Sequence, residues 1–128
     1  MAIKYGILAS SPFNWSAANV WADNADGSGT TYTAGANGTV NVSGDTVNLN
    51  GCVVTLDVSV TQTLITAAGS TGSLTVSGTK TITGAVTYAG TATTGMVIVP
   101  TGTNLTIVGA ATNTSTGTAV LASGTGNL

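Results

Sequence analysis

The sequence has 128 residues, of which 42% are hydrophobic and only 5% are charged, and its net charge is −2. Ordinary globular domains carry roughly 25% charged residues. Lys4 and Lys80 are its two cations. The chain therefore lacks the basic surface that binds nucleic acids and anionic membranes. We therefore expect neither a nucleic-acid partner nor a membrane partner.

The residue types also exclude most catalytic chemistry. Because the sequence contains no His, Arg or Glu, it cannot form a Ser-His-Asp triad, a Cys-His pair or a His-ligated metal site. Asp23 and Asp26 lie in a Gly/Ser-rich loop, where aspartate commonly starts turns, and this loop lacks the bidentate Glu of an EF-hand. We predict that the protein is not an enzyme and uses no catalytic residue, cofactor or metal.

Residue preferences predict an all-β fold. About a fifth of the residues are threonine, which is enriched in strands, and Gly, Ser and Asn supply turns. No segment has the i, i+3, i+4 apolar spacing of an amphipathic helix. A transmembrane helix is not expected, because the most apolar run, Met96–Val99, is much shorter than the roughly 17 residues that a span needs.

Residues 1–37 differ from the rest of the chain. They contain most of the aromatic residues, including Trp15, Trp21 and Tyr32, and the acidic loop 23–29. Large aromatic side chains can cover the exposed end of a repetitive β structure. We predict an irregular N-terminal cap or attachment segment in which these three aromatics contact a particle or a glycan. The alternative is an entry loop whose aromatics pack on the sheet.

Residues 38–128 form a second, strand-rich unit. Its clearest alternation runs from Val54 to Val60 and predicts that Val54, Leu56, Val58 and Val60 face inward while Thr55, Asp57 and Ser59 face outward. Further strands are expected at Thr39–Val42, Thr46–Leu49, Thr63–Thr66, Ser73–Val76, Thr81–Thr83, Val86–Tyr88, Met96–Val99, Asn104–Val108 and Thr118–Leu121.

Two architectures fit this succession of strands. A parallel β-solenoid buries Val, Leu and Ile inside each coil and turns at Gly- and Asn-bearing corners, and it is the architecture that we favour. An antiparallel β-sandwich is the alternative. Its best support is Asn50-Gly51 between two alternating runs, which is a hairpin signal but also suits a solenoid corner.

Internal similarity is present at a spacing of about 31 to 34 residues. Gly38–Gly44 resembles Gly72–Gly78, and Leu74–Val76 resembles Leu105–Ile107. Self-association is expected as well, because a weakly charged chain with open sheet edges is prone to pair with its own copies. The sequence therefore predicts a homo-oligomer.

The start of the chain predicts where the protein is made. Met1–Leu8 is too short and too polar for the apolar region of a secretory signal peptide. A single cysteine, Cys52, cannot form an internal disulfide and is expected to be a small packing residue. We expect synthesis in a cytoplasm without export.

A resemblance to known proteins rests on three groups of residues. These are Asn14-Trp15-Ser16 with Trp21, then Val53–Asp57 with Leu64-Ile65, and then Gly72–Val76. Together they resemble β-solenoid surface and fibre proteins, and most of all phage-encoded virion proteins that continue from a Trp-containing start into Gly/Thr/Ser-rich strands. The resemblance covers about two thirds of the chain. It implies a structural fibre or capsid-decoration subunit that is located in a virion and contacts itself and other virion proteins.

Two other functions are considered. A bacterial surface adhesin or carbohydrate-binding module would use Trp15, Trp21 and Tyr32 to stack on sugars and would be located on the cell surface. Ice binding is suggested by repeated Thr-x-Thr triplets such as Thr79/Thr81 and Thr101/Thr103. Threonine is also a common outward residue of an uncharged sheet.

Overall fold

A computed structural model describes residues 2–42, 44–65, 72–88, 97–113 and 120–122, and every structural statement below concerns these residues. The described chain is all-β, as predicted, apart from one turn of 3-10 helix, η1 (Leu8–Ser10). Within these residues, no helix is long and apolar enough to span a membrane.

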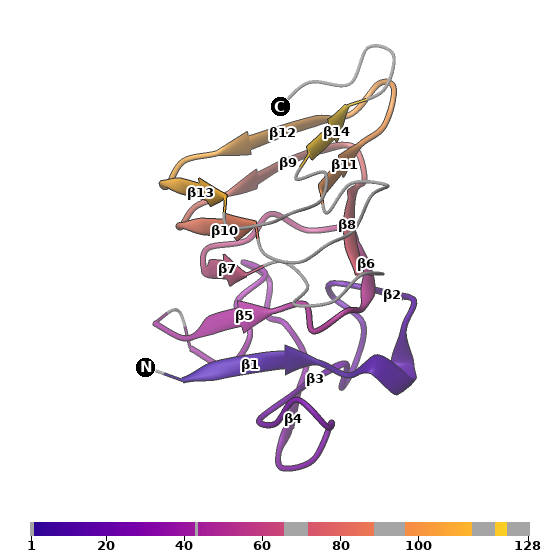
Figure 1. The fold of residues 1–128 in the computed structure, drawn as a ribbon, viewed down its shortest axis with the longest axis vertical. Coiled ribbons are helices and arrows are strands. Elements are labelled where there is room, and N and C mark those ends of the chain that lie inside the picture. The colour runs from indigo at the N-terminus through magenta and orange to yellow at the C-terminus, as the bar shows by residue number, and fades with distance from the viewer. Residues whose placement is uncertain (1, 43, 66–71, 89–96, 114–119, 123–128) are drawn as a thin grey trace.

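The strands form three sheets, and within each sheet the strands follow one another along the long axis of the molecule (Figure 1). Sheet A has the order β13 (Ala111–Asn113), β10 (Val86–Tyr88), β7 (Thr63–Ile65), β5 (Thr46–Asn48), β1 (Ile3–Gly6), β3 (Trp21–Ala22) and β4 (Thr31–Tyr32). Sheet B has the order β14 (Val120–Ala122), β11 (Val97–Val99), β8 (Ser73–Val76), β6 (Val53–Leu56) and β2 (Phe13–Asn14). Sheet C pairs β12 (Asn104–Ile107) with β9 (Thr79–Ile82).

From β5 onward the chain visits the sheets in a repeating order. It passes from β7 to β8 to β9, then from β10 to β11 to β12, each time through sheets A, B and C. Every strand pair within this part is parallel. Residues that pair on neighbouring strands are roughly 17 to 25 positions apart in the sequence. One round, meaning one passage through sheets A, B and C, is therefore close to the length of a short structural repeat.

The N-terminal end of the molecule is built differently. Residues 1–37 contain β1 to β4 and η1, and β1 joins sheet A by pairing in parallel with β5. On its other side β1 pairs antiparallel with β3, which pairs antiparallel with β4. The division of the chain after residue 37 stays a prediction. The strands of residues 1–37 belong to the same sheets as strands that follow residue 37.

The core consists of rows of apolar side chains on neighbouring strands. In sheet B, Phe13, Val54, Leu74 and Val97 occupy matching register positions, and each is buried. In sheet C the bridge from Val60 to Ile82 continues the same arrangement. Because strands are about 4.8 Å apart, each side chain packs directly on the side chain of the strand above.

The alternating segment Val54–Val60 buries its apolar residues as predicted, but its strand is shorter than the segment. Val54, Leu56 and Val60 are buried and Ser59 is exposed. Thr55, Asp57 and Val58 are half-buried, and of these Val58 packs against the core. The strand ends at Leu56, however, and Val60 already belongs to a bridge with Ile82 of β9. One run of alternating residues therefore contributes to two sheets, with a bend between them.

Most other expected strands are present, with shifted ends. Ser73–Val76 and Val86–Tyr88 form strands with the predicted bounds. Thr66, Met96 and residues 118–119, which ended or began other expected strands, lie outside the described residues. Strands β1 to β4 lie in the segment 1–37, which is predicted to be irregular, so they correct that expectation. Strand β13 is not predicted either, because Ala111–Asn113 lacks apolar alternation.

The strand predicted at Thr39–Val42 does not form. Val40 is fully buried there, and its backbone pairs with a side chain instead of a strand. The amide of Gln62 accepts a hydrogen bond from Val40 N at 2.8 Å and donates to Val40 O at 2.9 Å and Val42 O at 3.0 Å. This side chain supplies the hydrogen bonds that a neighbouring strand would otherwise provide.

The predicted spacing of the internal repeat is wrong. Leu74 pairs in register with Val54 and Val97, not with Leu105, and Leu105 pairs with Lys80 in a different sheet. The sequence similarity related a strand of sheet B to a strand of sheet C, because both expose Thr and bury Leu. The similarity therefore reflects residue types that the two strands share, although the two strands do not pair with each other.

The turn at Asn50-Gly51 connects two sheets. Asn50 and Gly51 have φ values of 55° and 78°, and Cys52 N donates to Leu49 O at 2.9 Å. The flanking strands β5 and β6 belong to sheets A and B and do not pair with each other. The turn is therefore a corner and does not close a hairpin.

Glycines also allow the rounds to stack closely. A Cβ atom on Gly84 would lie 2.3 Å from Gln62 O, and one on Gly109 would lie 2.1 Å from Gly84 O. Both obstacles are backbone atoms, so a side chain would force successive rounds apart. Gly44, by contrast, has no atom within 4 Å of its Cβ position.

We predict that Gly84→Ala lowers the free energy of unfolding by about 1–3 kcal/mol, as overpacking does. The matched control, Gly44→Ala, adds the same methyl group in open space and should change stability by about 0.5 kcal/mol or less. Urea unfolding followed by circular dichroism measures both. Equal stabilities for the two variants would show that the rounds are not packed through Gly84.

Candidate functional site

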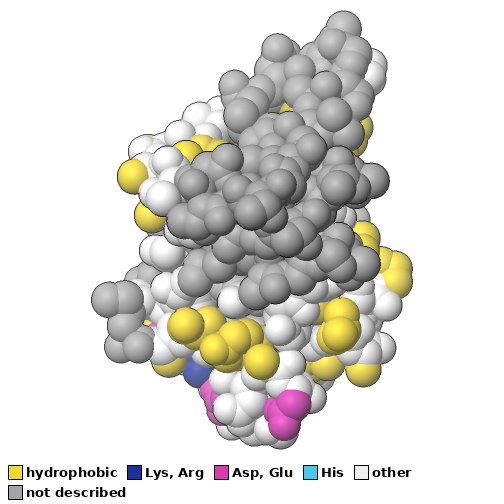
Figure 2. Space-filling view, viewed as in Figure 1, with side chains coloured by type: hydrophobic (Ala, Val, Ile, Leu, Met, Phe, Trp, Pro, Cys, Tyr) yellow, Lys and Arg dark blue, Asp and Glu magenta, His cyan; other side chains and the backbone are white. Residues whose placement is uncertain are grey.

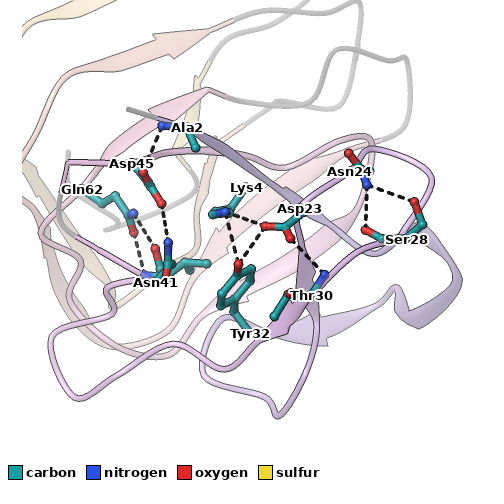
Figure 3. A network of polar contacts seen from close by, with 11 residues as sticks. Ala2, Lys4, Asp23, Asn24, Ser28, Thr30, Tyr32, Asn41, Asp45 and Gln62 are labelled. Atoms are coloured by element: carbon teal, nitrogen blue, oxygen red, sulfur yellow. Dashed lines mark hydrogen bonds and ion pairs between the residues drawn. The ribbon is translucent and has the colours of Figure 1, made fainter.

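Charged and aromatic side chains gather at the N-terminal end of sheet A (Figure 3). Lys4 of β1 contacts Asp23, which follows β3, with Nζ 2.6 Å from Oδ1. The hydroxyl of Tyr32 on β4 donates to the same Oδ1 at 2.8 Å. Lys4 Nζ also lies 4.7 Å from the centre of the Tyr32 ring, a cation–π distance. The three residues join three adjacent strands.

The ion pair of Lys4 with Asp23 is partly buried. The Lys4 side chain is 8% exposed and the Asp23 side chain is 33% exposed. The hydrogen bond to Asp23 raises the pKa of Lys4, against the opposing effect of burial. The hydrogen bonds from Lys4, Tyr32 and Thr30 N hold the pKa of Asp23 well below its usual range. Both groups are therefore charged across the neutral range.

The loop between β3 and β4 is held by its own polar groups. Asp26 Oδ1 accepts hydrogen bonds from Ser28 N at 2.9 Å and Ser28 Oγ at 2.6 Å. The Asn24 amide donates to Ser28 O at 3.2 Å and to Ser28 Oγ at 3.1 Å. These side chains form turns, as the sequence predicted. Among the described residues, no three His, Cys, Asp or Glu side chains lie close enough together to hold a metal ion.

The two tryptophans belong to the core. Trp15 and Trp21 are each 0% exposed, their ring centres are 4.7 Å apart, and Phe13 meets Trp21 edge-on at 5.4 Å. Trp15 Nε1 donates to Gly38 O at 2.8 Å, and Trp21 Nε1 donates to Trp15 O at 3.0 Å. Both indole nitrogens are therefore hydrogen-bonded inside the fold.

This burial corrects the expectation that Trp15 and Trp21 contact a glycan or a particle. A stacking platform needs an exposed ring face, and these rings expose none. Tyr32 is half-buried and lies on the outermost strand of sheet A, so it alone of the three reaches the surface. Its hydroxyl is already used by Asp23 and Lys4. The aromatics stabilise the N-terminal end from within.

Two further polar contacts at this end were not expected from the sequence. Asp45, which is 4% exposed, accepts from Ala2 N at 3.0 Å and from Asn41 Nδ2 at 2.8 Å, and these bonds lower its pKa. Gln62 holds the backbone of Val40. The partners of each are remote in sequence or belong to an irregular segment, so no local pattern marks them. The only available signal was that Gln62 is the single Gln of the chain.

The remaining candidate groups are also used within the fold. Asp57 accepts hydrogen bonds from the backbone N and the hydroxyl of Ser16, which fastens the segment after β2 to the end of β6. Cys52 is buried next to Gly6, and burial raises the pKa of its thiol to about 11. A thiol in that state is a poor nucleophile at neutral pH. Chemically, these groups hold strands together.

Comparisons of the chain with protein-family models, with curated proteins and with solved structures found no match.

We predict that Asp23→Asn lowers the free energy of unfolding at pH 7, because it leaves the buried Lys4 ammonium without its carboxylate. Asp26→Asn is the matched control, since it removes the same charge from a carboxylate that accepts hydrogen bonds from Ser28 within the same loop. Urea unfolding at pH 7 should show the larger loss for Asp23→Asn. A larger loss for Asp26→Asn would contradict the role assigned to the ion pair.

The stability contributed by the ion pair of Lys4 with Asp23 should also depend on pH. The folded-state pKa of Asp23 is lowered, whereas an unfolded Asp titrates near pH 3.9. Its stabilising contribution is therefore complete above about pH 5 and is lost as the pH falls below about 4. The decline in unfolding free energy between pH 5 and pH 3 should be shallower in Asp23→Asn than in wild type. Parallel declines would show that Asp23 does not carry the effect.

Proposed function

We propose that this protein is a non-enzymatic structural subunit of a virion, such as a capsid decoration or a fibre, and that it is built as a parallel β-solenoid. It would act by associating with its own copies and by docking on a larger particle. The observation that carries the proposal is the repeated passage through sheets A, B and C with parallel pairing at every step from β5 onward. Such a stack forms an elongated scaffold without requiring a cavity.

The register supports the solenoid. In a coiled β structure, equivalent residues of successive rounds lie above one another. Val97 lies between Leu74 and Val120, and Val86 lies between Leu64 and Ala111. Glycines at Gly84 and Gly109 allow close backbone approach between rounds. An antiparallel sandwich, the alternative architecture, is less well supported, because antiparallel pairing among the described residues is restricted to β1–β3 and β3–β4.

The chemistry of the polar groups supports a structural role. Asp23, Asp26, Asp45 and Asp57 each accept hydrogen bonds from within the chain. The buried cation Lys4 is paired with Asp23. A catalytic acid or base must reach the substrate whose proton it transfers, whereas these groups are bonded to other residues of the fold.

The choice of a virion rests on the resemblance to phage-encoded virion proteins that Asn14-Trp15-Ser16, Val53–Asp57 and Gly72–Val76 carry. The nearly uncharged, Thr-rich composition agrees with a part that packs against other structural proteins. The adhesin or carbohydrate-binding alternative depended on exposed tryptophans, and the burial of Trp15 and Trp21 removes that support. We therefore retain one proposed function.

Gold-labelled antibodies against the purified chain test this proposal. Applied to particles purified from lysed cells that produce the chain naturally, they should label virions at a regular position in electron micrographs. Antibodies absorbed beforehand with the purified chain are the control and should not label. Labelling of cell envelopes without labelling of virions would overturn the virion assignment and favour a surface protein.

A further inference from the structure

The peptide bond between Trp15 and Ser16 is contacted on both sides by groups that can react with it. Ser16 follows β2, and its backbone N and its hydroxyl both donate to Asp57. The N lies 3.1 Å from Oδ1, and the hydroxyl is bonded to Oδ2. On the other side of the bond, Trp21 Nε1 donates to Trp15 O at 3.0 Å. A hydroxyl, a carboxylate and an N–H donor therefore meet at one peptide bond.

This peptide bond is held in place by its neighbours. Trp15 N donates to Thr55 O at 2.8 Å. Ala17 N donates to Asn14 O at 2.9 Å, which closes a turn around the bond. The Trp15 side chain is fully buried and its indole N–H is bonded inside the fold, whereas Ser16 is half-buried. Reacting groups that are fixed in this way need little reordering before they react.

Each group has the contacts that a shift of an acyl group from nitrogen to oxygen requires. A serine hydroxyl reaches the carbonyl carbon of the residue before it by closing a five-membered ring, so no other segment has to move. The Asp57 carboxylate contacts both the hydroxyl that loses a proton and the nitrogen that gains one. Trp21 Nε1 contacts the oxygen on which negative charge develops. Because the chain contains no His, a carboxylate serves as the general base.

A second pair of serine and aspartate shows what distinguishes this place. In loop 23–29, Asp26 Oδ1 accepts from both the N and the hydroxyl of Ser28. Ser28 is exposed, at the end of the molecule where acidic side chains reach the surface (Figure 2), and no described side chain donates to Gly27 O. Such a pair closes a turn and is not a reactive site by itself. At Ser16 the indole donor on the preceding carbonyl is the additional element.

We propose that the chain cleaves itself between Trp15 and Ser16. Ser16 Oγ attacks the carbonyl carbon of Trp15 while its proton passes to Asp57 Oδ2. The C–N bond then breaks, the nitrogen takes up a proton from Asp57, and the Trp15 acyl group becomes an ester on Oγ. Water hydrolyses this ester, which leaves a carboxyl group on Trp15 and restores the Ser16 hydroxyl beside a free α-amine. Each chain reacts once, so the protein does not turn over a substrate.

The two products stay together in the folded state. Strands β1 and β2 precede the cleaved bond, and they pair with β3, β5 and β6, which follow it. The new α-amine of Ser16 faces the Asp57 carboxylate, because its nitrogen already lies beside Oδ1, and the two form an ion pair. Cleavage is therefore visible only after the fold is denatured. The inference goes beyond the proposed structural role and does not depend on it.

Mass spectrometry of the denatured chain, after incubation of the folded protein at neutral pH, tests the inference. Wild type should give two fragments that divide between Trp15 and Ser16. Hydroxylamine attacks esters faster than amides, so it should accelerate the cleavage and leave a hydroxamate on Trp15. Ser16→Ala removes the nucleophile and should stay intact, whereas Ser16→Cys retains a nucleophile and should cleave. The bond between Gly27 and Ser28 should stay intact in all variants.

Two tryptophan variants separate the chemistry from the packing. Trp21→Phe and Trp15→Phe each remove one indole N–H from a fully buried ring, but only the Trp21 indole is bonded to the carbonyl of the cleaved bond. Trp21→Phe should slow the cleavage about a hundredfold, and Trp15→Phe should slow it far less. Asp57→Asn should also slow it about a hundredfold or more, because an amide cannot take up the proton.

Circular dichroism shows which variants are folded. If a tryptophan variant or Asp57→Asn does not fold, the comparison of Ser16→Ala with Ser16→Cys still decides. An intact wild-type chain in the presence of hydroxylamine, equal cleavage of wild type and Ser16→Ala, or equal slowing in two folded tryptophan variants would each overturn the inference. Only the purified chain is needed, so these outcomes are independent of whether antibodies label virions.

Discussion

Parallel pairing in register is the constraint on which the rest of the structure depends. From β5 onward, each strand of sheets A, B and C hydrogen-bonds to the strand one round away, and this pairing places buried residues such as Val54, Leu74 and Val97 directly over one another. A slip of one residue would exchange the inward and outward rows. The same pairing requires corners that leave room for the next round, which explains why Gly84 and Gly109 approach neighbouring backbone so closely.

A stack of this kind has two ends, and the protein treats them differently. At the N-terminal end the sheet turns antiparallel through β3 and β4, and the ion pair of Lys4 with Asp23 joins the outer strands. Phe13, Trp15 and Trp21 fill the space beneath. Nearly all charge of the chain is located in this half. At the other end, strands β10 to β14 contain no charged residue.

This asymmetry connects the fold to the proposed role. The N-terminal end has short edge strands and two acidic residues, which disfavour strand pairing there. Polar side chains join segments of the fold: Asp57 binds the segment after β2, Asp45 binds the backbone of Ala2, and Gln62 binds the backbone of Val40 in place of a strand.

The amino-acid sequence by itself determined the all-β class, most strand positions and the inward residues of Val54–Val60, because side-chain alternation is a local property with a period of two. Only the tertiary structure decided the partners of those strands. The expected repeat related Leu74 to Leu105, but hydrogen bonding pairs Leu74 with Val97, since similar strand chemistry recurs in different sheets. Local sequence likewise did not reveal that Asn50-Gly51 is a corner, that Trp15 and Trp21 are buried, or that Lys4 meets Asp23. Those outcomes depend on contacts between segments distant in sequence, which composition and spacing do not encode.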